Sequence, residues 1–243
     1  MLVSIHQPNF LPWLKLLDKI LASEVYIAYD TVQYTKSEYH ARQKVKAPTG
    51  TSWLSVPLRH VPGVRQALRD VRLDNSQPFR YRHLKVLRAS YAATPYFDEV
   101  FAIVEQVYAR DHDHLVDLNL DLIEELCRYL ASPVRIVRAS HVPHQGDRTQ
   151  RLVQLVRGVG GTEHLTSTYG SGHQQVDWEQ FHHAGIGVRS QQFVHPVYPQ
   201  VGRGFVPDLS ALDMLFALGP RTSGVLAERR RLARVVPASA VGR

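Results

Sequence analysis

The spacing of apolar residues at the start of the chain predicts a strand, a helix and a second strand. Residues 2–5 form a short apolar run that ends at Pro8. Asn9 is of the residue type that caps helices, and residues 25–29 form a second apolar run that ends at Asp30. Three elements in so short a length predict a parallel, right-handed βαβ unit. Between the two runs, apolar residues recur every three or four positions, which is the spacing of one face of a helix. They are Phe10, Trp13, Leu14, Leu17, Ile20 and Leu21.

Apolar patterns in the rest of the chain continue this alternation of strands and helices. Between residues 79 and 131, three apolar stripes at helical spacing predict an insertion of about three helices. A third strand is expected at residues 52–58, after the turn at residues 48–50. The other expected elements are a strand at 134–137, a helix at 149–159, a loop at 163–176, a strand at 185–193 and a final helix at 209–219.

Together these elements predict an α/β fold with a mostly parallel sheet. The N-terminal βαβ unit starts the sheet, and the helical insertion lies in the middle of the chain. We find no internal repeat and no linker, so residues 1–224 are expected to form a single domain that includes the insertion at 79–131. Residues 225–243 are rich in Arg, Ala and Val, and we expect them to be a basic, frayed tail.

The composition narrows the class of protein. Hydrophobic residues make up 44% of the 243 residues and charged residues 21%, as in ordinary globular proteins. No run approaches the roughly 18 apolar residues that span a bilayer. Polar residues also interrupt the start of the chain, where a signal peptide has its apolar region. We therefore expect a cytoplasmic protein without membrane insertion. The single cysteine, Cys127, excludes a disulfide framework and a cysteine-based zinc site.

The net charge of +7 favours anionic partners, such as nucleotides, acyl carriers or RNA, because a positive field raises the rate of encounter. The sequence contains no zinc finger, helix-turn-helix or RNA-recognition motif, so we do not expect sequence-specific DNA binding. Transfer RNA fits the charge as a carrier of a substrate group. Apart from the tail, one basic group follows the second strand: Lys36, Arg42, Lys44 and Lys46.

Polar side chains follow both strands of the predicted βαβ unit. His6 and Gln7 come after the first strand, and Asp30 comes after the second. Parallel strands end at the same edge of a sheet, where open α/β sheets bind their ligands, so the three residues are expected to share one crevice. His6 is a candidate general base, or a donor to an oxyanion or phosphate; otherwise it caps the strand. Asp30 would orient a substrate or hold a metal; otherwise it caps a turn or a helix.

Further candidates for substrate binding lie in three loops. Gln33, Tyr34, Lys36 and Arg42 follow the second strand, and the two cations would clamp a phosphate or carboxylate unless they are solvated surface residues. The other candidates are Gly170 and Gly172, which would cradle an anion or form a plain turn, and Asp208, which would cap the last helix or reach a ligand.

No metal site or resident cofactor is expected. His112 and His114 are two residues apart and would point to opposite sides of a helix, whereas helical ligand pairs are three or four apart. The chain has no nucleophile elbow of the Gly-x-Ser-x-Gly type. Cys127 lies on an apolar helical stripe and is expected to be inert core.

The chain contains, in this order, the segments IHQPNFLPWLKLLDKI, YDTVQYTK, WLSVPL, EHLTSTYGSG and HPVYPQVGRGFVPDLSALDMLF. Taken together, these segments resemble the WbqC-like protein family over residues 3–220. The resemblance implies a cytoplasmic protein linked to the biosynthesis of O-antigen polysaccharide or of specialised metabolites. The chain departs from the family pattern at Lys15, where Gly is expected, and at His40-Ala41, where Asn is expected; both departures lie near the predicted site.

Three functions are compatible with these features. The first is a transferase that moves an acyl or aminoacyl group from an anionic activated donor to an amine or hydroxyl. The donor would be an acyl carrier or a nucleotide-linked or tRNA-linked group. In this hypothesis His6 deprotonates the acceptor and Asp30 orients the acceptor or His6. The donor's charge would be held by Lys36, Arg42 and the loop with Gly170 and Gly172.

The second hypothesis is a nucleotidyltransferase on an HUP-like sheet, which would use Mg²⁺. The spacing His6-x-Pro8-x-x-x-Pro12 is similar to the phosphate-binding motif of class I nucleotidylyltransferases, although the second histidine of that motif is missing. The third hypothesis is a non-catalytic binding protein of a biosynthetic cluster, in which the polar rim recognises a partner.

Overall fold

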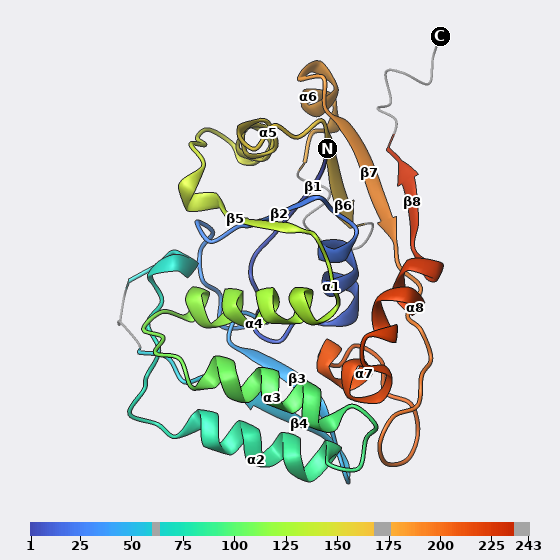
Figure 1. The fold of residues 1–243 in the computed structure, drawn as a ribbon. Helices are drawn as coiled ribbons and strands as arrows, with labels where there is room; N and C mark the ends of the chain where they lie inside the picture. Colours follow the sequence, from blue (N-terminus) through green and yellow to red (C-terminus); the bar gives the residue numbers. More distant parts are fainter. Residues whose placement is uncertain (60–63, 168–175, 236–243) are drawn as a thin grey trace.

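The computed structural model describes residues 1–59, 64–167 and 176–235. Its main sheet has six strands in the order β5-β2-β1-β6-β7-β8 (Figure 1). All neighbouring strands are parallel except β7 and β8, so the predicted α/β class and mostly parallel sheet are confirmed. The strands are β1 (Leu2–His6), β2 (Val25–Ala28), β5 (Arg135–Arg138), β6 (Glu163–Ser167), β7 (Gly187–Gln192) and β8 (Arg231–Arg234).

Helices cover both faces of this sheet. On one face, Leu16 and Ile20 of α1 (Leu14–Leu21) pack with Tyr26 of β2 and with α4 (Leu115–Tyr129). On the other face, Val3 and Ile5 of β1 pack against α5 (Arg148–Gly158) and α6 (Trp178–His183). Because successive residues of a strand point to opposite faces, a strand buried on both faces is apolar throughout. The short apolar runs seen in the sequence are therefore central strands of a doubly wound sheet.

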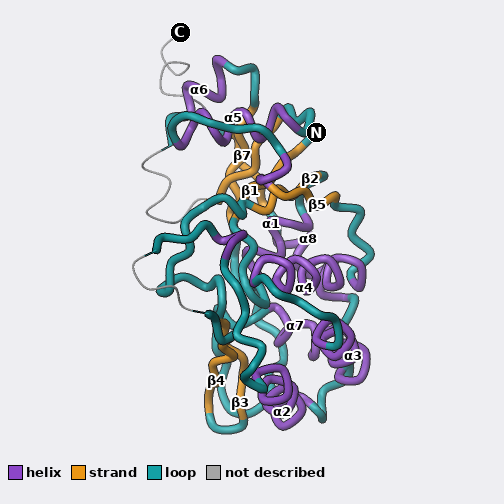
Figure 2. Tube along the Cα trace, turned by 90° about the vertical axis from the view of Figure 1, so that its left-hand side faces the viewer, coloured by secondary structure: helices purple, strands orange, loops and turns teal. Residues whose placement is uncertain are grey.

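The predicted helical insertion is present as three helices, α2 (Phe79–Tyr91), α3 (Phe97–Tyr108) and α4. They enclose the largest apolar cluster of the described residues together with α7 (Ala211–Leu218) and a separate two-stranded antiparallel sheet. This hairpin consists of β3 (Arg42–Ala47) and β4 (Gly50–Ser55) and lies away from the main sheet (Figure 2). The third strand expected at residues 52–58 thus belongs to the hairpin, and Arg42 lies in a strand that the sequence did not reveal.

The start of α1 differs from the prediction. The helix begins at Leu14 with Trp13 at its N-cap, and Asn9 is fully buried in the preceding segment with no hydrogen bond to its side chain among the described residues. Pro12 explains the difference, because a residue that precedes proline avoids the α-helical region. Leu11 has a φ of 42°, so no helix runs from Asn9 through this position.

The C-terminal region contains more regular structure than predicted. Residues 163–167 are strand β6 rather than a loop. Beyond Gly219, α8 (Arg221–Arg229) and β8 occupy residues expected to fray from 225 onwards. Arg230 explains the order, because its guanidinium lies 2.8 Å from the carboxylate of Asp18, which is 1% exposed in α1. Ser210 caps α7, since its hydroxyl accepts a hydrogen bond from the Leu212 N–H at 3.2 Å. Two short 3-10 turns, Leu68–Asp70 and Ala139–His141, complete the elements.

Candidate functional site

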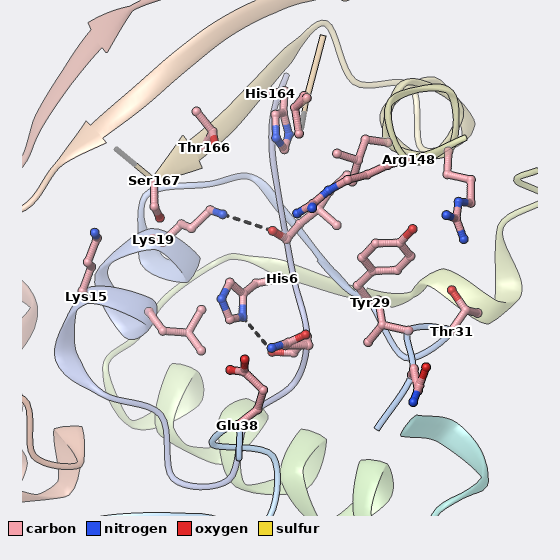
Figure 3. A pocket seen from close by; sticks show the side chains of 18 of the residues that line it. His6, Lys15, Lys19, Tyr29, Thr31, Glu38, Arg148, His164, Thr166 and Ser167 are labelled. Atoms are coloured by element: carbon pink, nitrogen blue, oxygen red, sulfur yellow. Dashed lines mark hydrogen bonds between the residues drawn. The ribbon is translucent and has the colours of Figure 1, made fainter. Parts of the chain in front are cut away.

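A cavity of about 880 Å³ opens at the carboxyl ends of β1 and β6. This is the point at which the strand order reverses, because the chain proceeds from β1 to β2 on one side and returns to β6 on the other. Doubly wound sheets bind their ligands at such a switch point. The polar and charged side chains around the cavity are His6, Gln7, Lys15, Lys19, Tyr29, Thr31, Gln33, Glu38, Arg148, Arg151, His164, Thr166 and Ser167 (Figure 3).

His6 lies in the middle of this cavity (Figure 3). Its Nδ1 lies 2.9 Å from the carbonyl oxygen of Gln7, which only accepts, so Nδ1 carries a proton and donates. Burial, together with the nearby charge of Lys19, lowers the pKa of His6 to about 3. The imidazole is therefore neutral near pH 7, with the lone pair on Nε2. That atom can accept a proton or a hydrogen bond from a ligand.

Two lysines from α1 bring positive charge to the cavity. Lys15 and Lys19 are four residues apart, so their side chains lie on the same face of the helix. Lys19 is 5% exposed, and its ammonium donates a hydrogen bond to the carbonyl oxygen of Ile5 at 3.1 Å. Burial lowers the pKa of Lys19 to about 7, and the charge of Lys15 adds to this effect. Burial also lowers the pKa of Lys15, against the opposing charge of Asp208.

The first turn of α5 contributes two more cations, Arg148 and Arg151. A capping box fixes the start of this helix, because the Asp147 carboxylate accepts from the Gln150 N–H at 2.9 Å and the Gln150 side chain accepts from the Asp147 N–H at 3.0 Å. In Figure 3 the Arg148 side chain extends over Tyr29. Burial raises the pKa of Tyr29, and the charges of both arginines oppose that rise.

The balance of charge around the cavity is therefore positive. Among the described lining residues, the cations are Lys15, Lys19, Arg148 and Arg151, whereas Glu38 is the one carboxylate. The N-terminus of α5 adds the positive end of a helix dipole. These positive charges would stabilise a phosphate or carboxylate in the cavity, which the neutral imidazole of His6 also lines. The arrangement fits an anionic ligand next to a proton acceptor.

Three of the residues predicted from the sequence lie together at this cavity: His6, Gln7 and Gln33. Asp30 is not among its lining residues. Its carboxylate is fully buried and accepts hydrogen bonds from the Ser140 N–H at 2.9 Å and the Ser140 hydroxyl at 2.6 Å. Asp30 thereby ties the end of β2 to the 3-10 turn that follows β5.

Tyr34 and Lys36 line a second cavity of about 460 Å³, which shares Gln33 with the first. Arg59 and Arg65 also line it, so this cavity has cations as well.

Two further candidates for substrate binding, Arg42 and Asp208, line neither cavity. Arg42 donates to the carbonyl oxygen of Ser37 at 3.2 Å. Asp208 has a φ of 57°, and its N–H donates to Nε2 of His195 at 3.3 Å. Gly170 and Gly172 lie outside the described residues.

The sequence did not single out Lys19, Arg148, His164 or Thr166. The spacing of Lys15 and Lys19 was a usable signal, because four residues place both on one face of the predicted helix. Arg148 and His164 gave no such signal, since only the strand order brings them beside His6.

Within residues 1–59, 64–167 and 176–235, no three His, Cys, Asp or Glu side chains are grouped as in a metal site. No helix in these ranges is long and apolar enough to cross a membrane. Cys127 is buried as predicted, and burial raises the pKa of its thiol to about 12.

The strand order and the cavity define a doubly wound α/β protein with a basic pocket at its switch point. A family model, described as the WbqC-like protein family, matches residues 7–224. The chain therefore belongs to the WbqC-like protein family, as its motifs predicted. It is similar to the uncharacterized protein Rv1507c of Mycobacterium tuberculosis, with 29% identity over 219 residues that cover 89% of this chain and 94% of the relative. No solved structure matches the chain.

Proposed function

We propose that this protein is a cytoplasmic transferase of polysaccharide or specialised-metabolite biosynthesis. It would move an acyl or aminoacyl group from an anionic activated donor to an amine or hydroxyl. One observation carries the proposal: four basic side chains and a neutral imidazole line one cavity at the switch point of the sheet. A phosphate-bearing donor requires such cations, and an acceptor amine or hydroxyl requires such a base.

In the proposed reaction, the donor's anionic group binds near Lys15, Lys19 and Arg148. Its negative charge offsets the field of the lysines and so raises the pKa of His6 towards its ordinary range. His6 Nε2 then takes the proton of the acceptor amine or hydroxyl as that group attacks the donor's carbonyl carbon. The new C–N or C–O bond forms, the bond to the carrier breaks, and the leaving carrier takes the proton from His6.

The second cavity supports a separate place for the acceptor, because Gln33 lines both cavities. Asp30 has no part in this scheme, since both of its carboxylate oxygens are bonded to Ser140.

The test combines a ligand screen with a histidine variant. Thermal shifts of the full chain with acyl-CoA, nucleotide sugars, nucleotides and aminoacyl-tRNA identify the donor class. With the responding donor, His6→Ala is expected to lower the transfer rate at least about 100-fold, the magnitude of general-base catalysis. The matched control is His183→Ala, which removes an exposed histidine from α6. An unchanged rate in a folded His6→Ala protein would remove His6 from the reaction.

A nucleotidyltransferase is the second candidate, favoured by the position of His6 at the end of the central strand β1, beside the switch point. This function predicts a thermal shift with ATP or CTP that requires Mg²⁺, together with exchange of labelled pyrophosphate into the nucleotide. A response to acyl or aminoacyl donors without such exchange favours the first candidate. If none of these donors shifts the melting temperature, both enzymatic proposals fail and a non-catalytic binding protein is favoured.

A further inference from the structure

A row of aromatic rings leads from the cavity to the surface of the β3–β4 hairpin. The ring of His6 meets Trp13 edge-on at 5.8 Å, and Trp13 lies 5.4 Å from Tyr39. Tyr39 in turn stacks on Trp53 of β4 at 6.2 Å, with 29° between the ring planes. Tyr39 is 37% exposed and Trp53 44% exposed. The row therefore begins at the candidate catalytic imidazole and ends in solvent.

Two cations lie against the exposed end of this row. The guanidinium of Arg42 is 4.9 Å from the centre of the Trp53 ring, and the ammonium of Lys44 is 5.0 Å from it. Lys44 faces Trp53 directly across the hairpin, and Arg42 lies two residues away on the same face of β3. Neither cation forms a salt bridge with any residue in the described ranges. Their charge is thus available to a ligand.

The fold itself does not require this exposed surface. The opposite face of the hairpin is its packed side, where Val45 and Leu54 are 0% and 1% exposed within the large apolar cluster. Trp53 and Lys44 lie on the other face, and neither belongs to that apolar cluster. A stacking site needs an aromatic ring with such exposure, and Trp53 supplies one.

We propose that Trp53, Arg42 and Lys44 form a stacking site for a nucleobase of the donor, with the adjacent phosphate held by the two cations. Exposed aromatic rings beside cations are the means by which proteins bind unpaired bases, because every base has a face that can stack. The inference deepens the proposed function, on which it rests. It makes the donor's carrier a nucleotide, either a free one or the end of an RNA strand.

The experiment measures binding of the full chain to a fluorescein-labelled single-stranded RNA of eight nucleotides, with AMP as competitor. Trp53→Ala is expected to weaken RNA binding roughly 5- to 150-fold, the range found for loss of one stacked base. Trp53→Phe, which keeps a ring, should retain most of the affinity. Tyr81→Ala is the matched control, because Tyr81 is an aromatic residue of α2 that is 68% exposed. Lys44→Gln should lower the slope of log K against log salt by about 0.7.

The two sources of the nucleotide give different results. Competition by AMP that depends on Trp53 assigns a free nucleotide, whereas RNA binding that AMP does not disturb assigns an RNA end. The inference is overturned if wild-type protein binds neither probe, or if Trp53→Ala binds as the wild type does. Inorganic pyrophosphate provides the separate readout for the cavity. A wild-type protein that responds to pyrophosphate without any Trp53-dependent binding would reject the stacking site alone, and a protein without a pyrophosphate response would reject the cavity.

Discussion

Lys19 is a lysine whose charge depends on ordinary changes of pH. Its ammonium is buried beside Lys15, and its pKa is lowered to about 7. Below that pH the side chain is charged and attracts an anion; above it the neutral amine does not. A bound anion raises the pKa again, so anion binding is coupled to proton uptake.

Anion affinity is therefore expected to fall as the pH rises above about 7. With sulfate as the probe, since its charge is constant between pH 6 and 9, Kd should rise by up to about tenfold per pH unit. Lys19→Met should bind sulfate more weakly at pH 6 and show a flat profile, as measured by isothermal titration calorimetry. Lys85→Met, which changes an exposed lysine of α2, serves as the control. A wild-type profile that is flat over this range would contradict the assigned role of Lys19.

Single residues show how far sequence reasoning reaches. His6 and Gln7 were expected at the carboxyl edge of the sheet, and both line the cavity there, because a strand end fixes the position of its own residues. Asp30 follows a strand at the same edge, yet it is bonded to Ser140, which lies 110 residues further along the chain. No local sequence pattern around Asp30 identifies Ser140 as its partner. A polar residue at a strand end is thus predictable in position but not in the bonds it makes.

At the scale of elements, α5 determines where two of the cavity's cations lie. Asp147 and Gln150 close the capping box, and Arg148 and Arg151 occupy the turn that the box orders. The helix was predicted within one residue at each end, because its apolar residues repeat at helical spacing.

Loss of this cap should affect stability and binding together. Asp147→Ala is expected to lower the free energy of unfolding by about 1 kcal/mol. It should also weaken pyrophosphate binding about two- to fivefold, because the frayed turn misplaces both arginines. Ser210→Ala removes the cap of α7 and is the matched control, with a similar loss of stability and unchanged binding. Urea unfolding and calorimetric titration measure the two effects. Equal binding by both variants would show that the order of this turn does not matter to the anion.

The strands that the sequence pattern did not predict, β6 and β8, were missed for the same reason. β6 carries His164 and Thr166 among its five residues, so it lacks the branched apolar composition of a buried strand. It is nevertheless central, because β1 and β7 pair with both of its edges. The β8 strand and Arg230 depend in the same way on partners in β7 and α1. Tertiary pairing decided these segments, whereas apolar periodicity sufficed for the helical insertion.

At the scale of the whole molecule, several histidines are held neutral by the fold. Burial lowers the pKa of His40 and of His83 to about 4, and that of His6 to about 3, against 6.5 in the unfolded chain. Below pH 6.5 the unfolded chain therefore binds protons that the folded chain does not. Protonation then favours unfolding.

The free energy of unfolding is accordingly expected to be highest above pH 6.5 and to fall as the pH drops towards 4. Each of these histidines contributes a slope of up to about 1.4 kcal/mol per pH unit. Urea unfolding at pH 7, 6 and 5 measures the slope. It should be shallower in His83→Gln than in the wild type, and unchanged in His183→Ala. A wild-type stability that is constant from pH 7 to 5 would be incompatible with neutral buried imidazoles.

The central place of β1 has a consequence for synthesis on the ribosome. β1 is made before the other strands of this sheet, and its pairing with β2 becomes available once Ala28 has emerged. Its other edge stays bare until Glu163–Ser167 has been made, since Leu2 pairs with Glu163. All three helices of the insertion are synthesised during that interval. A nascent chain of up to about 160 residues thus leaves one edge of its central strand β1 unpaired. An unpaired strand edge can form hydrogen bonds with a strand of another chain. A fragment of this chain that stops before β6 lacks three of the side chains that line the cavity around His6: His164, Thr166 and Ser167.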